Sequence, residues 1–587
     1  MNQTRTFLIF AWLMVAALLF MNWNSEQSAK NERAVAATTQ TPAQGQTPAA
    51  VDGSVPSAGS AATTAANGNG GIPNATAAAG ASAVPGMTAA PSNSAADVEV
   101  MTDVIKARIN GGSVNYAQLL EYPTQLGGKE DVVLMSSDPA NYSAAQAGWV
   151  GTNGAQAPTH EAAFTPATPG PFVMAQGQNE LKVPFVWTGA NGVTVTRTYT
   201  FKRGQYTVQV DDVVTNNGTA PWSGFAYRQL TRVPLQLDSK GPMHPESYSF
   251  NGAAWYSDAE KYDKRAFDKY AKEAPLNQAS TGGWVGMLQH HFFSAWIPDQ
   301  KEQVHINTAT TSANGATQYL IREVGTAHTV APGQSLTNSA RLWMGPKLVD
   351  QIKAQGVTGL DRAVDYSSFS IFAWIANILF WVLSRIHSIV GNWGWAIIGL
   401  TIVIRAVLYP LTAAQYQSAA KMRQFSPRIK QLQERYGDDK QKLQMATMEL
   451  YRKEKFNPMA GCLPAFLQIP IFMSMYWMLA ESVELRHAPW IGWIQDLTAR
   501  DPYFILPIIN VAVMTVTQHL TPMAPGMDPM QVKIMKWMPV VFGLLMLFMP
   551  AGLVLYWVTS GLIGLAIMHF INKRYAVNHA EGTTVSG

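Results

Sequence analysis

Five apolar stretches follow one another in the last part of the chain, and each is close to the length that crosses the hydrocarbon core of a bilayer. They cover residues 393–411, 465–480, 503–520, 535–549 and 553–571. A membrane-spanning helix needs about 20 mostly apolar residues. This pattern predicts a five-helix membrane core at residues 391–575.

A further apolar run lies near the N-terminus, where residues 7–21 follow Arg5. Its charge and length suit either a cleaved signal peptide or a retained anchor. Residues 22–26 lack the small-residue pattern of a cleavage site, and no cysteine is present there for lipidation. We therefore expect residues 1–23 to be a retained transmembrane anchor, which brings the expected spans to six. A cleaved signal peptide is the alternative.

Residues 24–99 are dominated by Ala, Thr, Gly, Pro, Ser and Gln and contain no aromatic residue. Such a segment cannot bury enough apolar area to offset the conformational entropy lost on ordering. We expect it to be a disordered tether on the export side of the membrane.

Residues 100–345 change to short runs of alternating apolar and polar residues, such as residues 193–201. Turn pairs separate these runs at Asn191-Gly192, Asn217-Gly218 and Asn314-Gly315. Alternation punctuated by Asn-Gly is typical of antiparallel hairpins. We expect a soluble all-β sandwich. The single cysteine of the chain, Cys462, excludes an intramolecular disulfide.

Residues 346–390 join this domain to the membrane core. The apolar run at 369–389 is interrupted by Asn377, Ser384, Arg385 and His387, and Trp374 and Trp381 share one helical face. This composition favours an amphipathic helix lying in the membrane interface. A true span is the alternative.

The loop between the second and third spans indicates the orientation. It carries ten basic residues, whereas the loop after the third span has only Arg486 and Arg500. Basic loops stay on the cytoplasmic side. Both termini, including a tail at residues 576–587, are therefore expected in the cytoplasm, and the β domain on the opposite side.

The basic loop, residues 412–462, has the periodicity of a helical hairpin. Its basic side chains could contact anionic lipid, a ribosome or an incoming chain, and an ordinary solvated face is the alternative. The residues that we single out there are Lys421, Arg423, Arg428 and Lys430.

Other function classes find little support. A net charge of +4 over 587 residues argues against nucleic-acid binding, and no nucleotide-binding loop is present. Ser560-Gly561 lacks the pattern of an intramembrane protease, because Val558 replaces a glycine and His569 shares no face with Ser560. His290 and His291 lie in a strand-like segment, where neighbours point to opposite faces, which argues against shared metal ligation. We predict no enzyme, metal or cofactor.

Arg405 is the most informative single residue. It lies twelve positions after Trp393, about 18 Å along a helix, inside an otherwise apolar span. A bare guanidinium there costs at least about 2.5 kcal/mol, so it faces protein or a water-filled cavity. Snorkelling to the headgroups is the alternative. Polar residues that could wet such a cavity are Thr401, Gln415, Gln417, Gln468, Gln518, Tyr556 and Thr559.

Methionine is concentrated near the C-terminus, since thirteen of 26 fall between Met459 and Met568. Flexible thioether side chains suit surfaces that bind varied apolar partners, although lipid-facing or core packing explains them as well. We predict that the third and fifth spans carry a sliding surface for an apolar segment. Its residues are Phe472, Met473, Tyr476, Met538 and Met546.

Six blocks, in order and at matching spacing, resemble the YidC family of membrane protein insertases of Gram-negative bacteria. They are Thr401-Ile-Val-Ile-Arg405, Tyr409-Pro410-Leu411-Thr412, Asn457-Pro458, Gly461-Cys462-Leu463-Pro464, Gln468-Ile-Pro-Ile-Phe472 and Gly552-Leu-Val-Leu-Tyr556-Trp557. The resemblance covers most of residues 345–575, and the anchor, tether and exported β domain match the family as well.

The resemblance implies a hydrophilic groove that is open to the cytoplasm and to lipid but closed outside. The groove arginine of the family matches Arg405, and its threonine matches Thr401. Trp557 stands where the family usually has a second tyrosine, and Gly561 where an asparagine is frequent. The exported domain would be a periplasmic supersandwich like those of sugar-binding proteins, but fold alone does not license a sugar activity.

The implied function is to insert, fold and assemble inner-membrane proteins without nucleotide hydrolysis. The implied partners are nascent and newly made inner-membrane proteins, the Sec translocon with its accessory subunits, the ribosome, the receptor of the signal recognition particle and membrane lipids. A passive chaperone or translocon accessory factor is one alternative. A small-anion transporter is another, although it would require paired repeats, which the sequence lacks.

Overall fold

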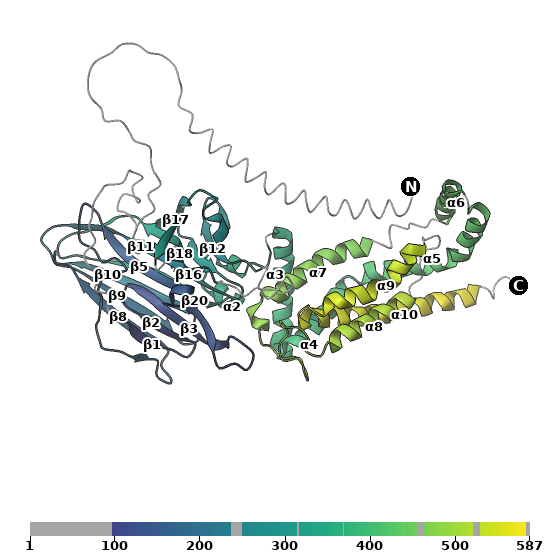
Figure 1. Cartoon of the computed structure of the whole chain (residues 1–587), viewed down its shortest axis with the longest axis horizontal. Coiled ribbons are helices and arrows are strands. Elements are labelled where there is room, and N and C mark those ends of the chain that lie inside the picture. Colours follow the sequence, from purple (N-terminus) through teal and green to yellow (C-terminus); the bar gives the residue numbers. More distant parts are fainter. Residues whose placement is uncertain are drawn as a thin grey trace, which may run out of the picture. The chain divides into compact units, whose positions relative to one another are not determined.

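The structure is a computed structural model of the 587-residue chain (Figure 1). The residues that it describes are 97–235, 249–313, 316–367, 369–437, 439–454, 463–520, 529–582. The predicted anchor (1–23) and nearly all of the tether (24–99) lie outside this part. Residues Phe425–Asn457 belong to a compact unit separate from the rest of the described chain.

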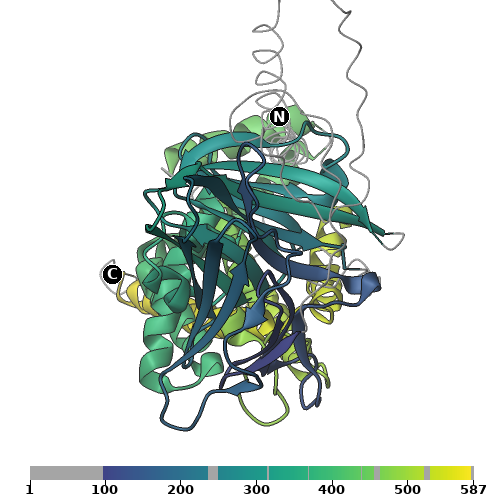
Figure 2. The same cartoon turned by 90° about the vertical axis from the view of Figure 1, so that its left-hand side faces the viewer.

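The described residues between 97 and 346 form two β-sheets, which lie face to face in Figures 1 and 2. In the described part, one sheet has eleven strands. Its order is β14 (Asn277–Thr281), β17 (Gln303–Ala313), β18 (Ala316–Gly325), β11 (Trp222–Arg232), β5 (Ser143–Gly151), β3 (Ser113–Pro123), β2 (Ile105–Ile109), β1 (Val98–Met101) and β7 (Phe172–Val173), with β19 (His328–Val330) on β11 and β4 (Asp131–Met135) on β3.

The other sheet has nine strands among the described residues. Its order is β13 (Lys261–Ala266), β12 (Gly252–Ser257), β15 (Trp284–Leu288), β16 (Phe292–Pro298), β20 (Ser335–Pro346), β10 (Thr207–Asn216), β9 (Val193–Lys202), β8 (Glu180–Thr188) and β6 (Thr165–Pro166). Neighbouring strands are antiparallel except for the parallel pair β1 and β7. The expected β-rich domain is confirmed.

The Asn-Gly pairs have different outcomes. Asn191-Gly192 closes the hairpin of β8 and β9, with Gly192 at φ 80°, a conformation that glycine adopts at no steric cost. Asn217-Gly218 was expected to close a hairpin, but it lies where the chain crosses from β10 in one sheet to β11 in the other. A turn signal fixes the local bend and does not determine which sheet the next strand joins. Asn314-Gly315 lies outside the described residues.

A buried ion pair joins the two sheets. Arg197 of β9 donates from Nε to Asp212 Oδ1 (2.7 Å) and from Nη1 to the carbonyl of Ala147 in β5 (2.7 Å). Trp149 Nε1 donates to the other oxygen of Asp212 (2.7 Å). Burial lowers the pKa of Arg197, but the Asp212 carboxylate outweighs this and raises it. Because these partners come from both sheets, the network fixes how the sheets face each other.

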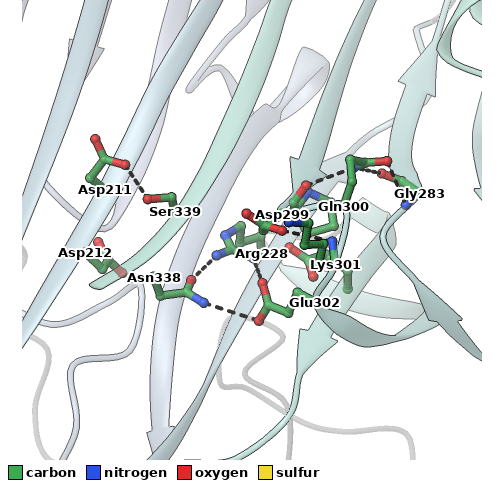
Figure 3. Close-up of polar contacts among 12 residues, drawn as sticks. Asp211, Asp212, Arg228, Gly283, Asp299, Gln300, Lys301, Glu302, Asn338 and Ser339 are labelled. Carbon is green, nitrogen blue, oxygen red and sulfur yellow. Dashed lines mark hydrogen bonds and ion pairs between the residues drawn. The ribbon is translucent and has the colours of Figure 1, made fainter. Parts of the chain in front are cut away.

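A second buried cluster surrounds Arg228 of β11 (Figure 3). Its guanidinium bonds to Glu323 and to Asn338, and lies 3.9 Å from Glu302. Asn338 in turn donates to Glu302 (3.2 Å). Two carboxyls therefore share one guanidinium. Burial first, and then the neighbouring Glu302, raise the pKa of Glu323 to about 7 against the lowering effect of Arg228.

The C-terminal part of the described chain is helical (Figure 1). Its helices are α2 (Val349–Ala354), α3 (Ser370–Val390), α4 (Trp393–Val407), α5 (Tyr409–Tyr436), α6 (Lys440–Lys453), α7 (Leu463–Glu481), α8 (Ile505–Leu520), α9 (Pro529–Met546) and α10 (Ala551–Gly582). By length and composition, α3 and residues Ala551–Ile571 of α10 could each cross a membrane. The bent pair α4 and Tyr409–Tyr416 could be a third span.

Helix α3 packs against α4 and α7 through one side only. Ala376 and Leu383 are buried on that side, whereas Trp374 and Trp381 are 62% and 58% exposed. The exposed side is therefore apolar. A helix of this kind is long enough to span the bilayer and also suits the interface, so the interfacial helix predicted for residues 346–390 stays a prediction.

The β domain and the helical core meet at the end of α7. His290 and His291 lie in the turn between β15 and β16, where their rings stack 3.7 Å apart. The Nε2 atoms of both lie within 3.0 Å of the Ala480 carbonyl. A carbonyl only accepts, so both nitrogens donate. The strand placement of this pair was wrong: a turn lets both side chains point the same way.

Candidate functional site

Helix α4 brings Arg405 into the helical core. The helix starts at Trp393 because Asn392 caps it, its side chain accepting from Trp395 N (3.2 Å). It ends at Val407, and the axis bends by 67° before α5 continues from Tyr409. Pro410 has no N–H to extend the preceding turn and restricts Tyr409, which explains the break. The predicted span 393–411 is thus two helices, and Arg405 lies in the last turn before the bend.

The guanidinium of Arg405 is held by a hydroxyl of α10. Its Nε and Nη2 donate to Ser560 Oγ, at 2.9 and 2.5 Å. Ser560 is buried and Arg405 is half-buried. Among the described residues, no carboxylate forms an ion pair with Arg405. The group that holds the positive charge of Arg405 is therefore a neutral hydroxyl, which we call its neutral tether.

Arg405 lines a cavity of about 370 Å³ between the helices of the core. The cavity walls come from α4, α5, α7, α8, α9 and α10. The lining residues are Arg405, Tyr416, Gln468, Asn510, Val513, Met514, Thr517, Gln518, Met535, Met538, Pro539, Tyr556, Trp557, Ser560, Gly561 and Gly564. None of these residues is acidic. The cavity thus combines one cation with amide and hydroxyl groups and a methionine-rich wall.

A second hydrogen bond crosses the cavity wall from α7 to α10. Gln468 Nε2 donates to the hydroxyl of Tyr556 (2.7 Å), which is buried. Trp557 lies next to Tyr556 and contacts Phe472 at a ring distance of 5.1 Å. Together with the Arg405–Ser560 contact, this bond holds α10 to both α4 and α7 around the cavity.

The structure brings together six of the predicted residues at the cavity: Arg405, Gln468, Gln518, Tyr556, Trp557 and Met538. Other predicted groove residues lie elsewhere. Thr401 is fully buried and donates to the Ile397 carbonyl one turn earlier (2.7 Å), while Gln415 is half-buried away from the lining.

The predicted sliding surface has a mixed placement. Phe472, Met473 and Tyr476 on α7 are half-buried, and Met538 on α9 is 51% exposed. Met546 is buried, with 2% of its surface exposed.

The separate compact unit Phe425–Asn457 contains the last part of α5 together with α6. Arg428 pairs with Glu454 across it (2.6 Å), and Lys430 is exposed. The side chains of Lys421 and Arg423 lie outside the described residues. The exposed basic positions leave open both a binding face and an ordinary solvated face.

Four polar lining residues were missed from the sequence: Tyr416, Asn510, Thr517 and Ser560. Asn510 stands in the apolar run Ile-Ile-Asn-Val-Ala and is 1% exposed, so it was the most detectable of them. The others are ordinary residues for a membrane helix, where small polar side chains commonly bond between helices. No spacing rule distinguishes those that face a cavity.

Comparisons with known proteins agree over the whole chain. The family model of the YidC periplasmic domain matches residues 97–382, and that of the 60Kd inner membrane protein matches residues 385–579. The membrane protein insertase YidC of Stenotrophomonas maltophilia (strain R551-3) is 51% identical over 100% of this chain and 99% of its own length. That of Xanthomonas axonopodis pv. citri (strain 306) is 51% identical over 98% of each chain.

A crystal structure of an active YidC insertase aligns with 81% of this chain and 92% of its own at 18% identity. Its TM-score of 0.36 is too low to carry an argument, so the assignment rests on the sequence relatives and family models. On that basis, the chain belongs to the YidC family of membrane protein insertases.

Proposed function

We propose that the cavity around Arg405 receives the acidic or polar tail of a substrate during insertion. As a YidC family member, the chain is an inner-membrane protein insertase and not an enzyme. The observation that carries the proposal is the guanidinium of Arg405 in the cavity wall, tethered by a neutral hydroxyl and facing no acidic lining residue. A cation in that setting attracts a carboxylate strongly, because low-polarity surroundings screen the charge poorly.

In this mechanism the cavity shortens the hydrocarbon barrier that the tail must cross. Water beside Arg405, Gln468 and Tyr556 solvates the tail partway through the membrane. The apolar segment of the substrate then slides along α7 and α9 into lipid, past Phe472, Met473, Tyr476 and Met538. Transfer of about 20 apolar residues into the bilayer drives the step without nucleotide. Met546 is buried and joins this surface only if α9 moves.

The proposed topology follows from the basic residues. Six spans, formed by residues 1–23 and by the core helices with α4 and the start of α5 as one span, place both termini in the cytoplasm. The periplasmic domain lies across the membrane, and α3 lies in the periplasmic interface. The basic hairpin of α5 and α6 then faces the cytoplasm, where anionic lipid and substrate are available.

The proposed partners beyond the substrates are the Sec translocon with its accessory subunits, the ribosome and the signal recognition particle receptor. Two other functions compete with autonomous insertion. A passive chaperone or translocon accessory would bind substrates without transferring them. An anion transporter would use Arg405 for a small solute, but it would require paired repeats around the site, which the sequence lacks.

The test is insertion of a two-span protein with a short acidic outer loop into liposomes that contain only this purified chain, scored by protease protection. We expect protection with the wild type, loss with Arg405→Ala and partial activity with Arg405→Lys. Arg385→Ala removes an exposed arginine of α3 outside the cavity and serves as the matched control.

If Arg405→Ala inserts the substrate as well as the wild type, and Lys offers no advantage over Ala, the capture mechanism is wrong. If the wild type gives no protection above empty liposomes although it crosslinks to the substrate, the passive chaperone function is supported instead.

A further inference from the structure

Helix α9 contains a proline at the cavity wall. Pro539 lies inside the helix and has no N–H, so the carbonyl four residues earlier, that of Met535, loses its helical partner. In a membrane core an unsatisfied carbonyl is costly, because lipid offers no donor. The helix therefore needs a donor from elsewhere at this position.

Helix α8 supplies that donor. The side-chain Nε2 of Gln518 donates to the Met535 carbonyl. Gln518 lies two residues before the end of α8 at Leu520, and Pro539 lies in the middle of α9. The bond thus joins the end of one helix to the free carbonyl at the proline break of the next.

The same three residues form part of the cavity wall: Gln518, Met535 and Pro539 all line it, together with Met538. The half of α9 before Pro539 also presents an exposed apolar face, since Ile534 and Trp537 are 58% and 59% exposed. This half of α9 therefore carries residues that line the cavity and residues that are exposed. Its position decides how open the cavity is on that side.

We propose that Gln518 is a positioning residue that fixes the half of α9 before Pro539 against α8. While the amide caps the Met535 carbonyl, this wall of the cavity stays closed; when the amide is removed, the segment pivots at Pro539 and the cavity widens. The consequence for insertion rests on the proposed role of the cavity, but the consequence for helix position does not.

A double-mutant cycle separates this role from direct contact with substrate. Gln518→Met keeps the size of the side chain and removes the donor. Pro539→Ala restores the N–H, so that the Met535 carbonyl is satisfied within α9 and no longer needs Gln518. We expect Gln518→Met to lower insertion about fivefold in the Pro539 background, the size of one lost hydrogen bond, and to have no effect in the Pro539→Ala background. Thr515→Val, which removes a hydroxyl bonded within α8, is the matched control.

A distance measurement tests helix position without any substrate. With Cys462 replaced by serine, spin labels on the exposed Ile402 of α4 and Ile534 of α9 report the position of the wall. We expect a broader and longer distance distribution in Gln518→Met than in the wild type, and a return to a narrow distribution in Gln518→Met/Pro539→Ala.

An unchanged distribution in Gln518→Met would overturn the proposal. An equal loss of insertion in both backgrounds would also overturn it and identify Gln518 as a substrate contact. If the label distances follow the cycle while no variant inserts protein, the positioning role stands and the proposed role of the cavity fails.

Discussion

Ser560 determines how Arg405 is presented to the cavity. Two of the five guanidinium N–H donors are used on one hydroxyl, which fixes the plane of the group, and within the described part of the chain no carboxylate pairs with the group. A carboxylate in place of Ser560 would hold the guanidinium more tightly but would compensate its charge. The serine therefore orients the cation without neutralising it.

The residue-scale prediction is that Ser560→Ala lowers insertion of an acidic-tailed substrate about fivefold, because Arg405 loses its orientation but keeps its charge. A substrate with an uncharged tail should be affected less. Both are measured by protease protection in liposomes. Ser474→Ala is the control: Ser474 is fully buried in α7 outside the cavity lining and its hydroxyl has no hydrogen-bond partner among the described residues, so its removal should leave insertion unchanged. Equal loss for both tails would contradict the orienting role.

At this scale the sequence predicted the cation but not its tether. A guanidinium in an apolar span has a high desolvation cost, which makes Arg405 visible without a structure. A serine in a membrane helix has a low desolvation cost, so Ser560 does not stand out in the sequence. It also lies 155 positions from Arg405 in the chain. Thr401, a hydroxyl one turn from Arg405, was expected in the groove; it donates to a carbonyl of its own helix and is not among the lining residues, so its groove role stays a prediction.

Helices α8 and α9 approach each other closely at Gly543. A Cβ built on Gly543 would lie 2.1 Å from Val511 Cγ2, so the contact has no room for a methyl group. Close approach of this kind strengthens van der Waals packing between membrane helices. It also places the half of α9 after Pro539 firmly on α8, in contrast to the half that Gln518 holds.

The element-scale prediction is that Gly543→Ala destabilises the core by about 1–3 kcal/mol through overpacking. Val511→Ala removes the clashing methyl, so the double variant should recover most of the loss. Thermal unfolding of the purified chain in detergent measures both. Additive losses in the double variant would show that the two positions do not share this contact.

Element boundaries were harder to predict than element types. The apolar stretch 393–411 reads as one span, but Pro410 divides it between α4 and α5 with a 67° bend. The mean hydropathy of a window that covers both helices does not detect such a break. Asn217-Gly218 similarly marked a turn correctly and the strand pairing wrongly, because pairing depends on contacts far along the chain.

The contacts between the β domain and the helical core depend on buried titratable groups. Arg486 donates to the Pro123 carbonyl (2.7 Å), and Glu484 accepts from Val349 N (3.2 Å). Burial raises the pKa of the Glu484 carboxyl to about 7. The same cause lowers the pKa of His291 well below its usual value, with His290 adding to the effect. At neutral pH His291 is therefore uncharged.

The whole-molecule prediction is a pH dependence of stability. Glu484 and Glu323 have folded-state pKa values of about 7, above the 4.5 expected in the unfolded chain. Between these values the folded state binds more protons at these two carboxyls, so the stability that they contribute is highest below pH 4.5, falls as pH rises to about 7 and then levels. His291, with its lowered pKa, contributes with the opposite sign as pH falls below 6.5, so the decline is assigned to the two carboxyls by comparison with their variants. Melting temperatures of the full chain across this range measure the trend.

The variants Glu484→Gln and Glu323→Gln should each remove part of this decline, and the double variant most of it. A decline of the same steepness in the double variant would assign the pH dependence to other groups. Glu484 is at the contact between the domains and Glu323 is inside the β domain. The two single variants therefore also show which of these regions loses stability first as pH rises.

The neutral tether of Arg405 has a consequence for turnover. An ion pair inside the cavity would be broken by each arriving substrate and re-formed after each departure, and both events would carry an activation barrier. With a hydroxyl as the partner of Arg405, no ion pair within the protein has to be broken when a substrate arrives or re-formed when it leaves. In the proposed mechanism the insertase thus returns to its initial state by substrate release alone, with no separate resetting reaction and no fuel.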